Sequence, residues 1–189
     1  MTDLLALDPS VRSPGVAVFR DGLLRYAAKV KVPTEYKVCP QGERWQRVAE
    51  CICDWVRHNA ELEFPRTIVY ERPQIYVASK AKGDPNDLIA LAAVGAAVVA
   101  TYQATLYTQY PSTTLRIKTE TPTPAEWAGQ IPKATKGSAK DSPRALRILS
   151  RLSDEEKARV PDQHDALDAI GLGLHSLGRL GIRRVYRSE

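Results

Sequence analysis

Two short apolar runs that each end in a carboxylate constrain the fold of this chain more than any other feature. Residues 4–7 (Leu-Leu-Ala-Leu) precede Asp8, and residues 67–70 (Thr-Ile-Val-Tyr) precede Glu71. Such runs are typical of strands covered on both faces of a sheet. Polar residues also end ordinary strands, so each acid alone indicates little. If the two strands are parallel neighbours, however, Asp8 and Glu71 share the carboxyl edge of the sheet, where α/β proteins bind ligands.

The remaining pattern predicts strands followed by alternating strands and helices. Residues 15–19 and 23–32 should form a hairpin around Asp21-Gly22. Gly171 and Gly173 each cost about 1 kcal/mol in a helix interior, which indicates that the last helix packs closely on the sheet. This order of elements predicts an α/β fold with a mixed central sheet flanked by helices, in one domain over 1–189. The expected helices are 43–61, 87–103 (apolar nearly all round and hence well buried), 143–152 and 161–180, with a further strand at 106–110 or 115–119.

The last predicted helix carries two acids on one side. Asp165 and Asp168 are three residues apart, and His164 precedes Asp168 by four, so the three share a helix face. Asp162 suits an N-cap and Asp165 the first helical turn, so capping could explain both. Asp168 lies one turn further on among apolar residues, where an inward charge is costly without a metal ion or a base. We therefore favour metal ligation over capping for Asp168.

Carboxylates from two strands and a helix would make a cluster of hard oxygen donors. Such donors suit Mg²⁺ or Mn²⁺ and not Zn²⁺. Two ions about 3.5 to 4 Å apart could activate water and stabilise the leaving oxygen in phosphodiester hydrolysis. Other chemistries fit less well. The pair His164-Asp165 resembles that of some metal phosphohydrolases, but the chain has only three His, and it contains no GxSxG, P-loop or GxGxxG motif.

Basic residues are concentrated in the second half of the chain. The net charge is +5, and residues 129–151 hold six bases against one acid, Asp141. A segment at about 111–143 contains Pro and Lys, and a short basic tail follows at 180–189. Each basic run could be a solvated face or a polyanion footprint, for which nucleic acid is the usual partner. Charge alone does not decide between them.

The composition excludes several classes of protein. At 43% hydrophobic and 26% charged residues, the chain is expected to be globular. Three cysteines without CxxC spacing argue for a reducing compartment and against a zinc ribbon. The apolar stretch 88–102 is short for a membrane span, and the first residues lack the pattern of a secretion signal. We expect a cytoplasmic protein, in a bacterial cell or a virus-infected host cell, with no membrane partner.

These residues resemble the RuvC-type crossover-junction endonucleases of the ribonuclease-H-like superfamily, virus-encoded members included. The likeness rests on Leu-Ala-Leu-Asp8-Pro-Ser with Gly15 seven residues on, Ile-Val-Tyr-Glu71, and residues 165–173 (Asp-Ala-Leu-Asp-Ala-Ile-Gly-Leu-Gly). Residues 88–99 resemble the central helix of the family, and residues 127–133 resemble a segment of virus-encoded members. The family often has Gly where this chain has Ser10. The resemblance implies a ribonuclease-H-like fold over nearly the whole chain.

Carried over by position, the resemblance also implies a catalytic site. Two Mg²⁺ or Mn²⁺ ions would be held by four acids, with His164 as an additional candidate ligand. The final motif has two registers, Asp162/Asp165 or Asp165/Asp168, and the small-residue run that follows favours the second. Lys133 would lie near the scissile phosphate, and Tyr76 is the nearest candidate for an aromatic wedge. The metal ligands are Asp8, Glu71, Asp165 and Asp168, and the residues expected to contact DNA are Tyr76, Lys80, Lys82, Lys133, Lys136, Lys140 and Arg144.

The sequence thus predicts a metal-dependent endonuclease that cuts branched DNA, most of all four-way (Holliday) junctions. A two-fold junction cut on opposed strands requires two related sites, which predicts a homodimer. Two alternatives stay open: a nuclease of this fold acting on flaps, loops or RNA–DNA hybrids, and a junction-binding protein without catalysis. An actin-like ATPase or sugar kinase shares the opening strand with its Asp and Gly. It would need about twice the length and a second glycine-rich phosphate loop, and this sequence has neither.

Overall fold

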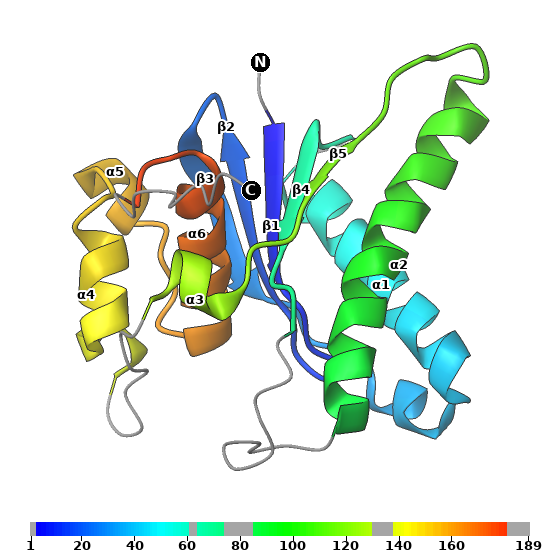
Figure 1. The fold of residues 1–189 in the computed structure, drawn as a ribbon, viewed down its shortest axis with the longest axis horizontal. Coiled ribbons are helices and arrows are strands. Elements are labelled where there is room, and N and C mark those ends of the chain that lie inside the picture. The colour runs from blue at the N-terminus through cyan, green and yellow to red at the C-terminus, as the bar shows by residue number, and fades with distance from the viewer. Residues whose placement is uncertain (1–2, 61–63, 74–84, 130–137, 181–189) are drawn as a thin grey trace, which may run out of the picture.

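The computed structural model of the chain describes residues 3–60, 64–73, 85–129 and 138–180. A five-stranded sheet of order β3-β2-β1-β4-β5 lies between two layers of helices (Figure 1). Strand β1 pairs parallel with β4, and β4 pairs parallel with β5, while β2 and β3 run antiparallel. The mixed α/β architecture predicted from the sequence is therefore confirmed. The strands are β1 (Asp3–Asp8), β2 (Gly15–Arg20), β3 (Leu23–Lys29), β4 (Thr67–Tyr70) and β5 (Lys118–Glu120).

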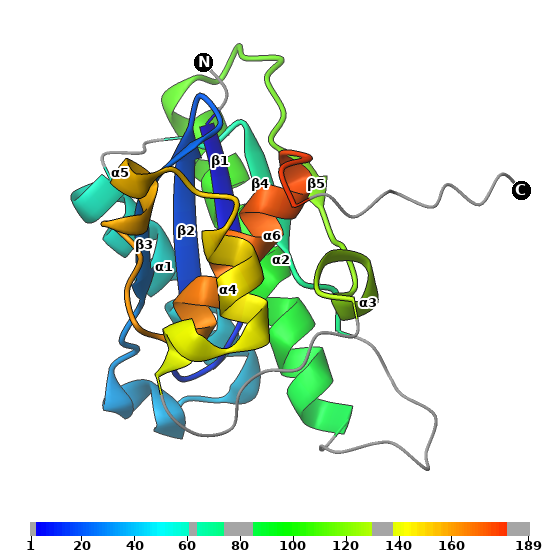
Figure 2. The same cartoon turned by 90° about the vertical axis from the view of Figure 1, so that its left-hand side faces the viewer.

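The helices divide between the two faces of the sheet, as Figures 1 and 2 show from two directions. On one face lie η1 (Thr34–Val38), α1 (Gln41–Ala60) and α2 (Pro85–Gln109). On the other lie α3 (Pro124–Trp127), η3 (Ala139–Asp141), α4 (Pro143–Leu149), α5 (Asp154–Lys157) and α6 (His164–Ser176). Helix α6 packs directly on β1, β2 and β3.

Alternation along the central strands divides the core in two. Leu4 and Ala6 of β1 pack in the cluster that contains α6, whereas Leu5 and Leu7 pack in the cluster that contains α1 and α2. Because successive side chains of a strand point to opposite faces, the alternation along residues 4–7 also gives the face on which the following residue lies. The next residue on the α6 side of β1 is therefore Asp8.

Glycines let α6 approach its neighbours closely, as the sequence predicted. A Cβ at Gly173 would overlap the ring of Phe19, and one at Gly171 would lie 2.6 Å from the indole of Trp127. At the other end of the helix, a Cβ on Gly15 of β2 would overlap the backbone carbonyl of Asp165. The start of α6 therefore lies against the sheet at Gly15.

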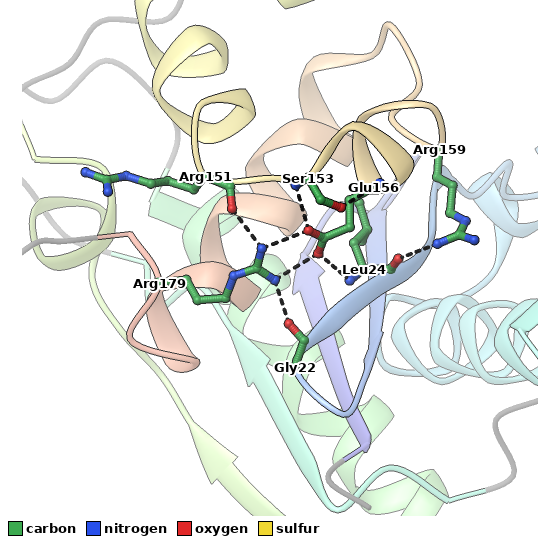
Figure 3. A network of polar contacts seen from close by, with 7 residues as sticks. All are labelled: Gly22, Leu24, Arg151, Ser153, Glu156, Arg159 and Arg179. Carbon is green, nitrogen blue, oxygen red and sulfur yellow. Dashed lines mark hydrogen bonds and ion pairs between the residues drawn. The ribbon is translucent and has the colours of Figure 1, made fainter.

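A buried ion pair fastens the end of α6 to the β2–β3 hairpin (Figure 3). Glu156 is 2% exposed and accepts two hydrogen bonds of 2.8 Å from the guanidinium of Arg179. It also accepts from the backbone N–H of Leu24, while Arg179 donates to the carbonyl of Gly22. The network joins three segments that are far apart in the sequence.

Three sequence-based expectations need correction. Helix α2 is not well buried: Ile89 and Tyr107 are exposed, because the helix packs on α1 with one side only. The segment 106–109 belongs to this helix, and the strand after it is Lys118–Glu120. The last helix begins at His164 with Gln163 as its N-cap, so Asp162 is not the cap.

Because α2 continues beyond the expected end at residue 103, its apolar part is longer than the stretch 88–102 noted in the sequence. The part Leu88–Gln109 is, by length and composition alone, long enough to cross a membrane, a property shared by core helices of soluble proteins.

Candidate active site

One row of residues across the sheet defines the candidate site. Lys29 of β3 pairs with Gly15 of β2, and Gly15 pairs with Asp8 of β1. On the other side of β1, Leu7 pairs with Tyr70 of β4, so the next residues, Asp8 and Glu71, lie opposite each other. The two apolar runs are thus parallel neighbours, which was the condition for their carboxylates to share one edge.

The sheet alternation directs both acids to the same face. Ala6 of β1 and Val69 of β4 belong to the core cluster under α6. Asp8 and Glu71 are each two residues further along, and side chains two apart on a strand share a face. Both carboxylates therefore lie on the α6 side of the sheet.

Helix α6 brings the third acid to this row. The carbonyl of Asp165 touches the position that a Cβ of Gly15 would fill, and Gly15 is the direct partner of Asp8. Gly15 thus permits a contact between helix backbone and strand backbone that any other residue would prevent. Asp165 lies over the row between Lys29 and Asp8.

Polar contacts with Asp165, Glu71 and Asp168 come from three different elements of the fold. Asp165 Oδ2 lies 2.9 Å from Lys29 Nζ. Glu71 Oε2 accepts a hydrogen bond of 2.8 Å from Trp127 Nε1. The third contact joins Asp168 Oδ1 to Arg144 Nη1 at 3.3 Å.

Asp168 is the most deeply placed of these carboxylates. Its side chain is 4% exposed and that of Arg144 is 17% exposed, so the pair is largely removed from water. The guanidinium of Arg144 also lies 5.2 Å from the centre of the Trp127 ring, within the range of a cation–π contact. Asp168 therefore points inward, as predicted, and the base that it meets is Arg144.

Asp162 has a structural role in this arrangement. Both of its carboxylate oxygens accept from the hydroxyl of Ser138, at 2.9 and 3.0 Å, and one accepts from the backbone N–H of Lys140. The hydrogen bond from Ser138 is the main reason that the pKa of Asp162 lies below its usual value. Asp162 thus joins η3 to the chain leading into α6.

The donor set fits a hard divalent cation by its chemistry and placement. Asp8, Glu71, Asp165 and Asp168 supply carboxylate oxygens from β1, from the end of β4 and from α6, on one side of the sheet. Within the described residues, no three His, Cys, Asp or Glu side chains are grouped closely enough to hold a metal ion as they stand. Asp165 and Asp168 instead lie beside Lys29 and Arg144, cations that a metal ion would have to replace.

The other sequence-predicted residues divide into two groups. Tyr76, Lys80, Lys82, Lys133 and Lys136 lie outside the described residues, as does the tail 181–189. His164 lines a pocket beside Asp165, Lys140 supports Asp162 through its backbone, and Arg144 faces Asp168.

Sequence reasoning missed two residues of the site, Lys29 and Trp127. The only available signal for Lys29 was its place at the end of a strand paired with Gly15. Trp127 lies in a segment that the resemblance had singled out, but nothing in its spacing pointed to Glu71.

The architecture is similar to that of solved Holliday junction resolvases. Thermus thermophilus RuvC in complex with Holliday junction substrate matches with a TM-score of 0.58 and 14% identity, over 96% of this chain and 98% of that one. The yeast mitochondrial Holliday junction resolvase Ydc2 matches with a TM-score of 0.58 and 10% identity, over 98% and 82%. No protein-family model and no curated protein matches the chain. At these identities the likeness concerns the fold, and the RuvC-type, ribonuclease-H-like fold expected from the sequence is confirmed.

Proposed function

We propose that the chain is a metal-dependent endonuclease that hydrolyses phosphodiester bonds in branched DNA, most of all in four-way junctions. The observation that carries this proposal is the placement of Asp8 and Glu71 at the carboxyl ends of two neighbouring parallel strands, on the side of the sheet covered by α6, which carries Asp165 and Asp168. A fold shared with two solved junction resolvases supports the choice of substrate. A binding protein would gain nothing from such acids, because they repel phosphate.

The proposed cofactor is a pair of Mg²⁺ or Mn²⁺ ions held by Asp8, Glu71, Asp165 and Asp168. When bound, they would activate water and stabilise the charge that develops on the leaving oxygen. The engagement of Asp162 by Ser138 supports the register Asp165/Asp168 for the α6 ligands. Trp127 fixes one oxygen of Glu71, and Arg144 holds Asp168 in place.

Several basic side chains are proposed to contact the DNA backbone. Lys133 is proposed to act near the scissile phosphate, and Tyr76 to insert at the centre of the junction. Such phosphate contacts would position the DNA without reading its sequence. The remaining proposed contacts are Lys80, Lys82, Lys136 and Lys140, whereas Arg144, which the sequence also offered for this role, is engaged by Asp168.

We also propose that two copies act together, since a junction with two-fold symmetry is cut symmetrically by two related sites. The outer face of α2 supports this proposal. It exposes Ile89, Ala96 and Tyr107, and no charged residue occurs from 88 to 109. An uncharged helix face on the protein surface is suited to contact with its own copy.

Cleavage of a defined panel of substrates tests the proposal. We expect the protein to cut a mobile four-way junction in Mg²⁺ or Mn²⁺, to be inactive in chelator, and to cut linear duplex and single strands poorly. Asp8→Asn should retain the fold and junction binding but lose nearly all cleavage. Preferential cleavage of flaps or RNA–DNA hybrids would show that the protein is a nuclease with another substrate. Junction binding without cleavage in either metal would refute the proposal that it is an enzyme.

A further inference from the structure

We propose that the pocket beside Asp165 binds a backbone phosphate of the DNA, and that Lys29 is the residue that contacts it once a metal ion has taken over Asp165. This inference rests on the proposed function. The pocket has a volume of about 360 Å³. It is lined by Lys29, Ser138, Ala139, Asp162, Gln163, His164 and Asp165.

The pocket is contiguous with the acid cluster, because Asp165 belongs to both. A phosphate in it would therefore lie beside the proposed metal site. Asp162, the second acid of the pocket, is held by hydrogen bonds from the Ser138 hydroxyl and from the backbone N–H of Lys140, so its oxygens are engaged within the protein.

Lys29 is anchored at its backbone, whereas its side chain is exposed to solvent. Its N–H donates to Oε1 of Gln163, the residue that precedes α6, at 3.1 Å. Its ammonium lies 2.9 Å from Asp165 Oδ2, yet 41% of its side chain is exposed. The strand end is thus fixed beside the helix start, while a flexible four-carbon stem can move the charge within the pocket.

The side chain of Arg144 is more buried than that of Lys29. Its side chain is 17% exposed and packs against the indole of Trp127, so its charge is confined beside Asp168. Of these two cations, Lys29 has the more exposed side chain and can exchange its partner more easily. A metal ion on Asp165 would satisfy that carboxylate, and a phosphate would supply the new counter-ion for Lys29.

If Lys29 exchanges its partner in this way, its substitution should strengthen the binding of a divalent ion and weaken the binding of DNA. Lys29 competes with a cation for Asp165, so Lys29→Gln should tighten divalent-ion binding to the DNA-free protein. Exposed ion pairs are weak, and we expect an increase in affinity of about two- to fivefold. The same substitution removes one phosphate contact, so junction binding should weaken, with the log–log salt slope flatter by about 0.9 on duplex arms.

The experiment combines two measurements on wild type, Lys29→Gln and Lys31→Gln. Mn²⁺ affinity is measured by titration calorimetry without DNA, and junction affinity is measured in Ca²⁺ across a salt series with uncut substrate verified on gels. Lys31 is the matched control, because it is an exposed lysine two residues further along the same segment. Loss of the Lys31 charge should change neither the Mn²⁺ affinity nor the salt slope by as much as loss of Lys29.

The outcomes separate this inference from the proposed function. Tighter Mn²⁺ binding together with a flatter salt slope in Lys29→Gln supports the exchange. Unchanged values in Lys29→Gln, with a wild type that binds Mn²⁺ and cuts junctions, overturn the role of Lys29 and leave the nuclease intact. A wild type that binds no Mn²⁺ at all overturns both.

Discussion

The indole N–H of Trp127 donates a hydrogen bond of 2.8 Å to Oε2 of Glu71, across 56 residues of sequence. Trp127 is 1% exposed and ends the short helix α3, whose start is fixed by a capping box between Thr123 and Glu126. The same ring lies against the guanidinium of Arg144, which in turn faces Asp168. One buried side chain thereby links an acid at a strand end to an acid on α6.

Trp127→Phe should therefore weaken the site without destroying it. The substitution keeps an aromatic ring beside Arg144 but removes the donor that fixes Glu71. Groups that orient metal ligands typically contribute about 10- to 100-fold in metal affinity or activity. We expect junction cleavage to fall by about that factor and to recover in part at high Mn²⁺, as measured by the Mn²⁺ concentration needed for half-maximal rate.

Trp55→Phe is the matched control, since Trp55 lies on α1, on the opposite face of the sheet. It should leave the Mn²⁺ dependence unchanged. An identical shift in both variants would mean that Trp127 acts on general stability and not on Glu71.

Removal of the charge of Arg144 should destabilise the metal-free protein. Arg144→Met leaves the buried Asp168 without its neighbouring cation, and breaking a buried ion pair from one side costs about 3 kcal/mol or more. Added Mn²⁺ would replace the missing charge, so the rise in melting temperature on adding Mn²⁺ should be larger in the variant than in wild type. Thermal unfolding in chelator and in Mn²⁺ measures both effects.

Arg147→Met on the same helix provides the comparison, because Arg147 contacts the backbone carbonyl of Leu180 and, among the described residues, no carboxylate. Equal Mn²⁺ shifts in wild type and Arg144→Met would place Asp168 outside the metal site.

Gly15→Ala should impair the site through the backbone. The added Cβ would overlap the carbonyl of Asp165, which belongs to a helix and cannot turn aside as a flexible side chain could. Overpacking of this kind costs about 1 to 3 kcal/mol, and relief requires the start of α6 to move away from Asp8. We expect cleavage to be nearly abolished while the protein still folds, as judged by circular dichroism and urea unfolding.

Gly42→Ala is the counterpart, since no atom of the part of the chain that the structure describes lies within 4 Å of the position of its Cβ. It should keep full activity. Full activity in Gly15→Ala would show that the contact between Gly15 and Asp165 does not position the acid.

The sequence was sufficient for the positions of Asp8 and Glu71 because each is encoded locally. Four apolar residues before an acid specify a buried strand, and two such strands in an α/β order are expected to pair in parallel. The close approach of α6 could be read from its glycines for a similar reason. Only a residue without Cβ fits where a helix touches Phe19 of the sheet.

The partners of the acids could not be read because they depend on tertiary contacts. Nothing near Asp168 in sequence indicates Arg144, so the sequence suggests an acid that repels its neighbours. It predicts that Asp168→Asn leaves the metal-free protein as stable or more stable. With Arg144 3.3 Å away, loss of that carboxylate also removes an attraction. Likewise Asp162 resembled a helix cap, but Ser138 binds it from another segment.

The stability of the fold should depend on pH through Glu156. Burial alone would raise the pKa of this carboxyl, but hydrogen bonds from Arg179 and from the N–H groups of Leu24 and Ser153 lower it to about 2. The folded pKa lies below the unfolded value of about 4.5, so the stabilisation is complete above that pH and is lost as the pH falls towards 2. By linkage it amounts to at most about 3 kcal/mol.

Urea unfolding of wild type and Glu156→Gln at pH 7 and pH 3 measures this contribution. The difference in unfolding free energy between the two proteins should be large at pH 7 and smaller at pH 3. Glu155→Gln serves as the control, because Glu155 pairs with Arg159 at the surface with 69% of its side chain exposed. A difference that does not change with pH would show that Glu156 contributes through packing alone.

The oligomeric state tests the role proposed for α2. The helix has 25 residues and is therefore about 37 Å long, and its outer face presents Ile89, Ala96 and Tyr107 at helical spacing. Ala96→Arg would introduce one charge at the middle of this face, and two copies related by two-fold symmetry would each carry it. By light scattering, we expect the wild type to be a dimer and the variant to be a monomer. The monomer should cut one strand of a junction without coordinated cleavage of the opposed strand. Leu146→Arg, which replaces an exposed apolar residue on the opposite helical layer, should stay dimeric. A dimeric Ala96→Arg protein with coordinated cleavage would exclude this face of α2 as the interface.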